Sequence, residues 1–206
     1  MIMRILVRTI PPWYSFDMTE PLTIVERLRE VALDQHGFVT ARQAEAEGIN
    51  PVELVKLAAR GRLERVARGV YRVPQVIGGR WENWALAVFW TGVPEACLSH
   101  ETALAAWDIS DINPEHIHLT VPRDKRLRRA GGERYVIHRA NLEPHQRSWF
   151  EQIPITDVAT TIGDCIDWGV PTYLIKQAFE RTHDTSLLLP GERDLLGRQL
   201  EVRDHG

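Results

Sequence analysis

The segment Phe38–Val73 constrains the fold of this chain more than any other part of the sequence, because signals for two helices and a hairpin follow one another there without a gap. Thr40, with Gln43 three residues later, forms a capping box, which satisfies the free N–H groups at the start of a helix. Gly48 can end that helix in the left-handed conformation. These signals predict a short helix that begins directly after Thr40.

A second helix and a basic hairpin follow at once. Asn50 is a favourable N-cap, Pro51 suits the first helical position, and Gly61 is the next stop signal. The sequence RLERVARGVYRV then predicts two short strands, with Arg68-Gly69 at the tip between them. The order of these elements is therefore helix, turn, helix, two-stranded wing.

A further helix is predicted before this segment, over Thr23–Gln35. Thr23 and Glu26 form another capping box, and apolar residues recur at helical spacing after them. Three helices followed by a basic hairpin are typical of a winged helix-turn-helix, a module that most often binds DNA. We therefore predict an N-terminal winged-helix DNA-binding domain over residues 19–77.

The second helix of the pair has two faces. Val52, Val55 and Ala59 step by three and four residues, so they are expected to face the core. Lys56 and Arg60 follow similar intervals on the other side. A DNA-recognition helix needs such a polar face, because its long side chains must reach into the major groove.

The charge of the chain is unevenly distributed. From Lys56 to Arg80 there are seven basic residues and one acidic residue, a net charge of +6, whereas the whole chain has −3. An isolated basic run is usually only a solvated face, but this one coincides with the predicted helix and wing, which favours a phosphate-binding surface. Winged helices that bind proteins are the alternative. The residues expected to contact DNA are Thr40, Arg42, Gln43, Lys56, Arg60, Arg62, Arg65, Arg68 and Arg72.

A second basic segment lies further along the chain. His116–Pro122 reads as a strand, Tyr135–Arg139 as its partner, and Gly131-Gly132 as a turn between them. Seven basic and two acidic residues give Arg123–Arg139 a net charge of +5. This segment is either a second nucleic-acid contact or a solvated hairpin. Its candidate contact residues are Arg123, Lys125, Arg126, Arg128 and Arg129.

The remaining sequence predicts a mixed domain over residues 78–206. Helices are expected at 81–90, 99–107, 156–167, 172–182 and 190–202, so the fold class is α/β, mainly helical, with a small sheet in this second domain. Residues 140–206 carry a net charge of −5, which suits packing, oligomerisation or a protein partner better than DNA. Residues 1–18 are expected to be an extension or a disordered arm.

Histidine and cysteine residues raise the question of a metal or catalytic site. His116 and His118 point to the same side of the predicted strand, and His138 on its partner could approach them. A zinc site needs three or four ligands, and histidines on a surface strand are common, so no metal is predicted. Cys97 and His100 are close only in sequence, which favours a structural role for both.

The hypothesis that the protein is a nuclease rests on Asp164 and Asp167, which lie three residues apart on one predicted helix. An acid-x-Lys strand should accompany such carboxylates, yet neither Lys125 nor Lys176 follows an acid by two residues. The sequence also has no phosphate-cradling glycine-rich loop and no Gly-x-Ser-x-Gly elbow. We therefore expect neither an enzyme nor a cofactor.

Composition narrows the cellular setting. The 206 residues are 44% hydrophobic and 26% charged, as in ordinary soluble proteins, and no apolar run is long enough to cross a membrane. The two cysteines, Cys97 and Cys165, are too few for a disulfide framework. A cytoplasmic protein with reduced thiols is expected.

The chain resembles the AbiEi family of antitoxins and related transcriptional regulators. The resemblance covers about residues 20–170 and rests on FVTARQAEAEGIN, LVKLAARGRLERVARGVYRVP, SHETALAAWDIS with HIHLTVP, and the segment Ile153–Asp167. It implies a DNA-binding repressor of its own operon, paired with a nucleotidyltransferase toxin. It places the DNA-reading helix at Pro51–Arg60 and the wing at Arg62–Val73. Related proteins carry varied C-terminal domains, including nuclease-like ones.

These inferences together predict a transcriptional repressor, the autoregulating antitoxin of a toxin–antitoxin operon. The expected partner is double-stranded DNA with an inverted repeat near the promoter, bound by a homodimer. The alternatives are a protein-interaction module that neutralises the toxin through the acidic C-terminal region, and a nuclease-related protein.

Overall fold

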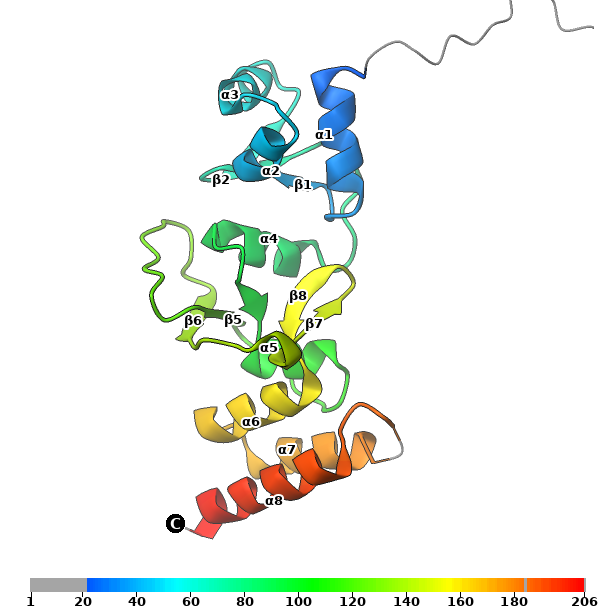
Figure 1. Ribbon diagram of the computed structural model, residues 1–206, viewed down its shortest axis with the longest axis vertical. Helices are drawn as coiled ribbons and strands as arrows, with labels where there is room; N and C mark the ends of the chain where they lie inside the picture. Colours follow the sequence, from blue (N-terminus) through cyan, green and yellow to red (C-terminus); the bar gives the residue numbers. More distant parts are fainter. Residues whose placement is uncertain (1–21, 184, 206) are drawn as a thin grey trace, which may run out of the picture.

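The structure is a computed structural model that describes residues 22–183 and 185–205. The predicted N-terminal extension, residues 1–18, lies outside the described residues. The described chain is an elongated stack of three parts, as Figure 1 shows: an N-terminal unit of helices and a small sheet, a second sheet with α4 and α5, and a C-terminal helical layer. The chain is therefore a mixed α/β protein with eight α-helices and two small sheets in the described ranges.

Local capping signals determine where the N-terminal helices begin. Thr23 and Thr40 both form the predicted capping boxes, and the Asn50 side chain accepts a hydrogen bond from the backbone of Val52. The predicted helix starts are confirmed. The elements of this unit are α1 (Ile24–Leu33), β1 (Phe38–Thr40), α2 (Ala41–Ala46), α3 (Pro51–Ala59), β2 (Glu64–Ala67) and β3 (Val70–Arg72).

The predicted hairpin forms, but it is part of a three-stranded sheet. The strand order is β1-β3-β2, with all pairs antiparallel. Gly69 at the hairpin turn has φ +73°, a conformation that glycine adopts without strain. Strand β1 is not evident in the sequence, because three residues are too short to show a periodic pattern.

The orientation of α3 differs from the prediction. Leu54 is fully buried and Leu57 half-buried, whereas Val52 and Val55 are 54% and 55% exposed. Ala59 is exposed as well, so the expectation that these three residues face the core is wrong. Two overlapping apolar stripes run along this helix, and the stripe with the larger leucine side chains faces inward because it buries more apolar area.

The second part is a five-stranded sheet in the order β6-β5-β4-β8-β7. Helix α4 packs on one face, whereas α5 and α6 lie on the other (Figure 1). The predicted "small sheet" is thus confirmed, with β4, β7 and β8 as strands that the sequence did not reveal. The elements are α4 (Glu82–Thr91), β4 (Cys97–Leu98), α5 (His100–Ala106), β5 (Ile117–Val121), β6 (Tyr135–Arg139), a 3-10 turn (Pro144–Gln146), β7 (Arg147–Phe150) and β8 (Ile153–Thr156).

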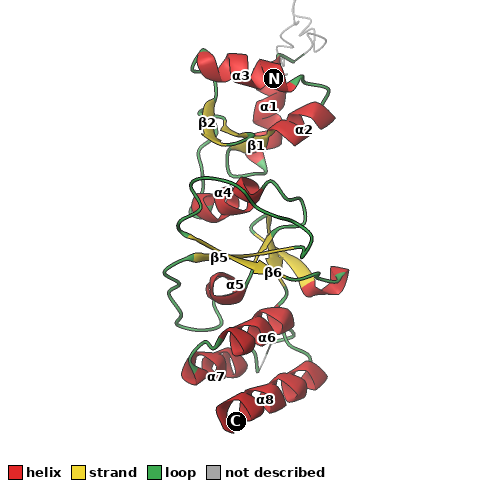
Figure 2. Ribbon diagram, turned by 90° about the vertical axis from the view of Figure 1, so that its left-hand side faces the viewer, coloured by secondary structure: helices red, strands yellow, loops and turns green. Residues whose placement is uncertain are grey.

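Strands β5 and β6 pair in parallel, from Ile117 opposite Tyr135 to Val121 opposite Arg139. The interpretation of the second basic segment as a hairpin is therefore wrong, because parallel strands need a crossover connection. Residues 122–134 cross to the α4 side of the sheet, and Figure 2 shows this connection passing in front of α4. The Trp90 indole N–H donates to the carbonyl of Ala130 (2.9 Å), which fixes the crossing point.

The N-terminal unit and the second sheet share one hydrophobic core. Phe38 of β1 and Val70 of β3 are buried in the same cluster as Val88 of α4 and Leu98 of β4. The ring of Phe38 also lies 6.1 Å from that of Phe89. The small sheet is therefore sandwiched between its own helices and α4.

The C-terminal layer consists of the predicted helices, now α6 (Val158–Trp168), α7 (Thr172–Arg181) and α8 (Pro190–His205). Their inward residues form a core with Leu104 of α5, and α6 buries four residues in it: Val158, Ile162, Cys165 and Ile166. Within the described residues, no helix combines the length and the apolar character that a membrane crossing requires.

Candidate nucleic-acid interface

Helix α3 presents its polar residues on the exposed side of the N-terminal unit. Lys56 and Arg60 are both exposed, as predicted. The Lys56 ammonium lies 2.7 Å from a carboxylate oxygen of Glu53, one turn earlier. Such an exposed pair contributes at most about 1 kcal/mol, so the lysine can exchange this partner for a phosphate at little cost.

The hairpin carries three free arginines and one that is engaged. Arg62, Arg65 and Arg68 are exposed, and none of them forms an ion pair within the described residues. Arg72 is half-buried and contacts both carboxylate oxygens of Glu82 in α4, at 2.9 and 3.3 Å. Arg72 therefore joins the small sheet to α4, and its charge is already paired.

The start of α2 offers one free basic side chain. The capping box occupies Thr40 and Gln43, because the Thr40 hydroxyl donates to the Gln43 amide oxygen (2.8 Å) and accepts from the Gln43 backbone N–H (3.2 Å). Arg42 is exposed and forms no ion pair or hydrogen bond within residues 22–183 and 185–205. Of the three residues predicted here, Arg42 is thus the one with an uncommitted donor group.

The two basic segments meet in space. The Arg129 guanidinium donates a hydrogen bond to the carbonyl of Arg68 at the hairpin tip (Nη1 to O, 2.9 Å). Figure 1 shows α3, the hairpin and the β5–β6 connection on the same side of the molecule, and this side faces the viewer in Figure 2. The remaining predicted residues lie on that connection, with Arg123, Arg126 and Arg128 exposed and Lys125 beside Asp124 (3.3 Å).

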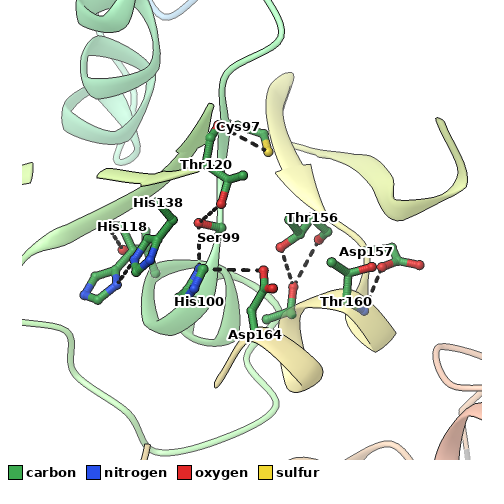
Figure 3. A network of polar contacts seen from close by, with 12 residues as sticks. Cys97, Ser99, His100, His118, Thr120, His138, Thr156, Asp157, Thr160 and Asp164 are labelled. Atoms are coloured by element: carbon green, nitrogen blue, oxygen red, sulfur yellow. Dashed lines mark hydrogen bonds and ion pairs between the residues drawn. The ribbon is translucent and has the colours of Figure 1, made fainter. Parts of the chain in front are cut away.

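A buried polar cluster, separate from the basic segments, lies between the five-stranded sheet and α6, as Figure 3 shows. His118 Nδ1 and His138 Nε2 are 3.0 Å apart, and the His100 ring stacks on His138 with 3.4 Å between centroids. Ser99 stands at the N-cap position of α5, but its hydroxyl contacts His100 Nδ1 (3.0 Å) and accepts from Thr120 (2.8 Å). Ser99 therefore caps α5 without a side-chain hydrogen bond to the helix backbone.

The histidines of this cluster are held neutral. Burial, followed by the neighbouring histidines, lowers the pKa of His100 to about 3. Burial likewise lowers the pKa values of His118 and His138 to about 4. Among the described residues, no group of three or more His, Cys, Asp or Glu could hold a metal ion.

Burial disfavours the ionised forms of Asp164 and of the Cys97 thiol. Burial, with Asp167 and Asp157 as further causes, raises the pKa of Asp164 to about 7. Its Oδ2 atom is buried without a hydrogen-bond partner in the described chain and lies 3.6 Å from His100 Nδ1. Asp167, one turn further along α6, is exposed. Burial also raises the pKa of Cys97 to about 12, which keeps that thiol unreactive.

These observations define a mixed α/β protein with a basic face built from two distant segments. Residues 26–74 match the family described as "Transcriptional regulator, AbiEi antitoxin". The resemblance seen in the sequence is thereby confirmed for residues 26–74.

The other comparisons add little. The structure is similar to the crystal structure of the RV2827C protein from Mycobacterium tuberculosis, with a TM-score of 0.41 and 13% sequence identity over 86% of this chain and 75% of that chain. This similarity is too low to support an argument about function. No curated protein matches the chain.

Proposed function

We propose that this protein is a DNA-binding transcriptional repressor of the antitoxin type, and that its N-terminal unit is a winged helix. In this proposal α3 enters the major groove with Lys56 and Arg60, and the β2–β3 hairpin is the wing. The protein binds an inverted repeat near its own promoter as a homodimer.

One observation carries the proposal: the two basic segments form a continuous face through the contact between Arg129 and Arg68. The β5–β6 connection adds positive charge directly beside the hairpin tip, so a duplex that contacts the wing would also reach this connection. Arg62, Arg65 and Arg68 hold no carboxylate of the described chain that would first have to be displaced. The match of residues 26–74 to a family of transcriptional regulators supports the same function.

The salt dependence of DNA binding tests this proposal. Each phosphate contact contributes about one to the slope of log affinity against log salt, so Arg65→Ala and Arg128→Ala should each flatten the slope by about one. Both variants should weaken binding to every sequence alike, because phosphate contacts carry no base information. Fluorescence anisotropy with a duplex from the protein's own promoter, at several salt concentrations, measures both effects.

Arg198→Ala is the matched control, because Arg198 is an exposed arginine on α8 at the far end of the molecule. The proposal fails if all three variants behave alike, or if the unaltered protein binds no duplex at low salt. Base recognition by α3 in the major groove is tested separately. Lys56→Ala or Arg60→Ala should weaken the free energy of binding to the operator by about 1–3 kcal/mol, and binding to unrelated DNA by less.

A second candidate function is neutralisation of a nucleotidyltransferase toxin by the C-terminal helices. It is favoured by large apolar side chains that α7 and α8 expose, notably Tyr173 (64% exposed) and Val202 (74%). The acidic character of residues 140–206 also makes this region a poor DNA surface. Exposed apolar side chains on an acidic layer fit a protein partner.

A full-length Tyr173→Asp variant separates the two functions. If α7 contacts the toxin, this variant should lose neutralisation in a growth assay while DNA binding stays unchanged. Arg198→Ala again provides the control for an exposed change in the same layer. Full neutralisation by Tyr173→Asp would argue against a contact at α7.

A further inference from the structure

A cavity of about 720 Å³ lies where the N-terminal unit meets the second sheet. Its walls come from six separate places in the chain: the turn after α1, the start of α2, the hairpin tip, the end of α4, the β5–β6 connection and the β7–β8 turn. Sites for small molecules occupy about 300–1,000 Å³ and favour the junctions between structural units. The cavity therefore has the size and the position of a ligand site.

Three arginines are among the residues that line this cavity. Arg42, Arg68 and Arg129 line it, and Asp34 is the one carboxylate among its lining residues. No ion pair within the described ranges involves any of the three guanidinium groups. The charged lining thus has an excess of two positive charges.

The position of Arg129 is fixed before any ligand arrives. One of its N–H groups donates to the Arg68 carbonyl, and the guanidinium lies directly against the backbone of Gly92, where a Cβ atom would overlap it. Burial, followed by the nearby Arg68, lowers the pKa of Arg129. Two like charges held close together without a carboxylate are unfavourable, and a bound anion would relieve this repulsion. Guanidinium groups also match carboxylates and phosphates in a bidentate manner.

Much of the remaining lining is apolar, alongside the polar side chains of Gln35, Thr40, Gln43 and Gln152. The larger apolar lining residues are Val70, Val88, Phe89, Val93, Pro94, Trp149 and Pro154. A phosphate of a DNA backbone would need only the arginines, whereas an apolar wall stabilises an apolar part of a ligand. We propose that this cavity binds a small organic anion, a carboxylate or phosphate ester attached to an apolar or aromatic group.

The location suggests what such a ligand would do. The start of α2 and the hairpin tip, which line the cavity, belong to the surface assigned to DNA. The other walls belong to the second part of the molecule, where α4 packs on the five-stranded sheet and the β7–β8 turn joins two of its strands. A ligand that prefers one arrangement of these parts shifts the population towards it and so changes DNA affinity. This regulatory consequence rests on the proposed function, whereas ligand binding does not.

Calorimetric titration of the full chain with phenyl phosphate, in the absence of DNA, tests the site. We expect saturable binding with a dissociation constant below about 5 mM, weakened about tenfold or more in Arg129→Gln. Arg134→Gln is the matched control, because Arg134 is an exposed arginine of the same connection that does not line the cavity. This control should bind within about twofold of the unaltered protein.

Two further measurements define the ligand and the place. Inorganic phosphate should bind about tenfold more weakly than phenyl phosphate, because it lacks the apolar part. Val93→Trp, which keeps all three arginines but places a bulky side chain at the apolar wall of the cavity, should strongly weaken binding of phenyl phosphate. The site is overturned by absence of saturable binding, by equal weakening in Arg129→Gln and Arg134→Gln, by equal affinity for inorganic phosphate, or by full binding in Val93→Trp.

The regulatory part has its own readout. Saturating phenyl phosphate at constant ionic strength should change the affinity for the promoter duplex about threefold or more, and Val93→Trp should be insensitive. If affinity does not change, the regulatory part is wrong although the site stands. If the protein binds no duplex at all, the proposed function fails while the calorimetric result on the cavity is unaffected.

Discussion

Two kinds of buried titratable residue in the polar cluster have opposite effects on stability. Burial lowers the pKa values of His118 and His138 to about 4. Between that pH and 6.5, the unfolded chain binds protons that the folded chain does not, so their contribution makes stability rise with pH. Burial raises the pKa of Asp164 from 3.8 to about 7, so in this range the folded chain holds a proton that the unfolded chain has released. Its contribution therefore makes stability fall as pH rises.

The Asp164→Asn variant should separate the two effects. Asparagine mimics the protonated acid and does not titrate, so the loss of stability between pH 5 and pH 7 that Asp164 causes should disappear. Relative to the unaltered protein, the variant should gain roughly 1–3 kcal/mol over this interval, since one pKa unit corresponds to about 1.4 kcal/mol. Urea unfolding at several pH values measures the difference.

Asp194→Asn provides the comparison for this experiment, because Asp194 is exposed on α8 and is not among the charges that raise the pKa of Asp164. Its stability relative to the unaltered protein should stay nearly constant over the same interval. Equal pH dependence in the two variants would mean that the burial of Asp164 does not govern its protonation.

At the scale of the elements, the orientation of α3 has direct consequences for stability. Leu54 is fully buried, whereas Val55 beside it is 55% exposed. Leu54→Ala should lower the free energy of unfolding by about 2–5 kcal/mol, because it removes apolar contacts and leaves a cavity. Val55→Ala should lower it by less than about 1 kcal/mol. Denaturant unfolding compares the two. If Val55→Ala is the more damaging variant, the helix faces the other way, as its valine stripe alone would indicate.

The ion pair between Arg72 and Glu82 connects β3 to α4. Arg72→Ala should therefore lower stability by about 1–3 kcal/mol, since it leaves a half-buried carboxylate without its partner. Its effect on DNA affinity should be smaller than that of Arg65→Ala, because the Arg72 charge is already paired. Thermal unfolding and anisotropy on the same two variants check both expectations. A larger loss of DNA affinity in Arg72→Ala would show that this residue leaves Glu82 to bind phosphate.

At the scale of the whole molecule, the shared core limits how far the predicted domains act separately. Phe38 and Val70 are each 1% exposed and pack in the cluster that includes α4 and β4. A fragment of residues 19–77 would expose both side chains, at a cost of about 3–5 kcal/mol. We expect its amide protons to exchange faster than those of the same residues in the full chain. Equal protection in fragment and full chain would contradict a stabilising role for the shared core.

The sequence by itself determined the local features of this protein. Helix starts at Thr23, Thr40 and Asn50 depend on contacts between residues two or three positions apart, so the capping signals could be read directly. In the C-terminal layer, α6 was visible in its spacing of apolar residues, and the two later helices in their content of Leu, Arg and Glu. The basic character of both segments is also a property of the sequence alone.

Only the tertiary structure decided how these features combine. The parallel pairing of β5 with β6, the inward stripe of α3 and the contact between Arg129 and Arg68 all join residues that no local rule relates. Whether two strands pair in parallel depends on the path of the chain that connects them. A helix with two apolar stripes turns inward the stripe that buries more apolar area. The position of the second basic segment beside the hairpin, and with it the arginine-lined cavity, follows from this long-range packing.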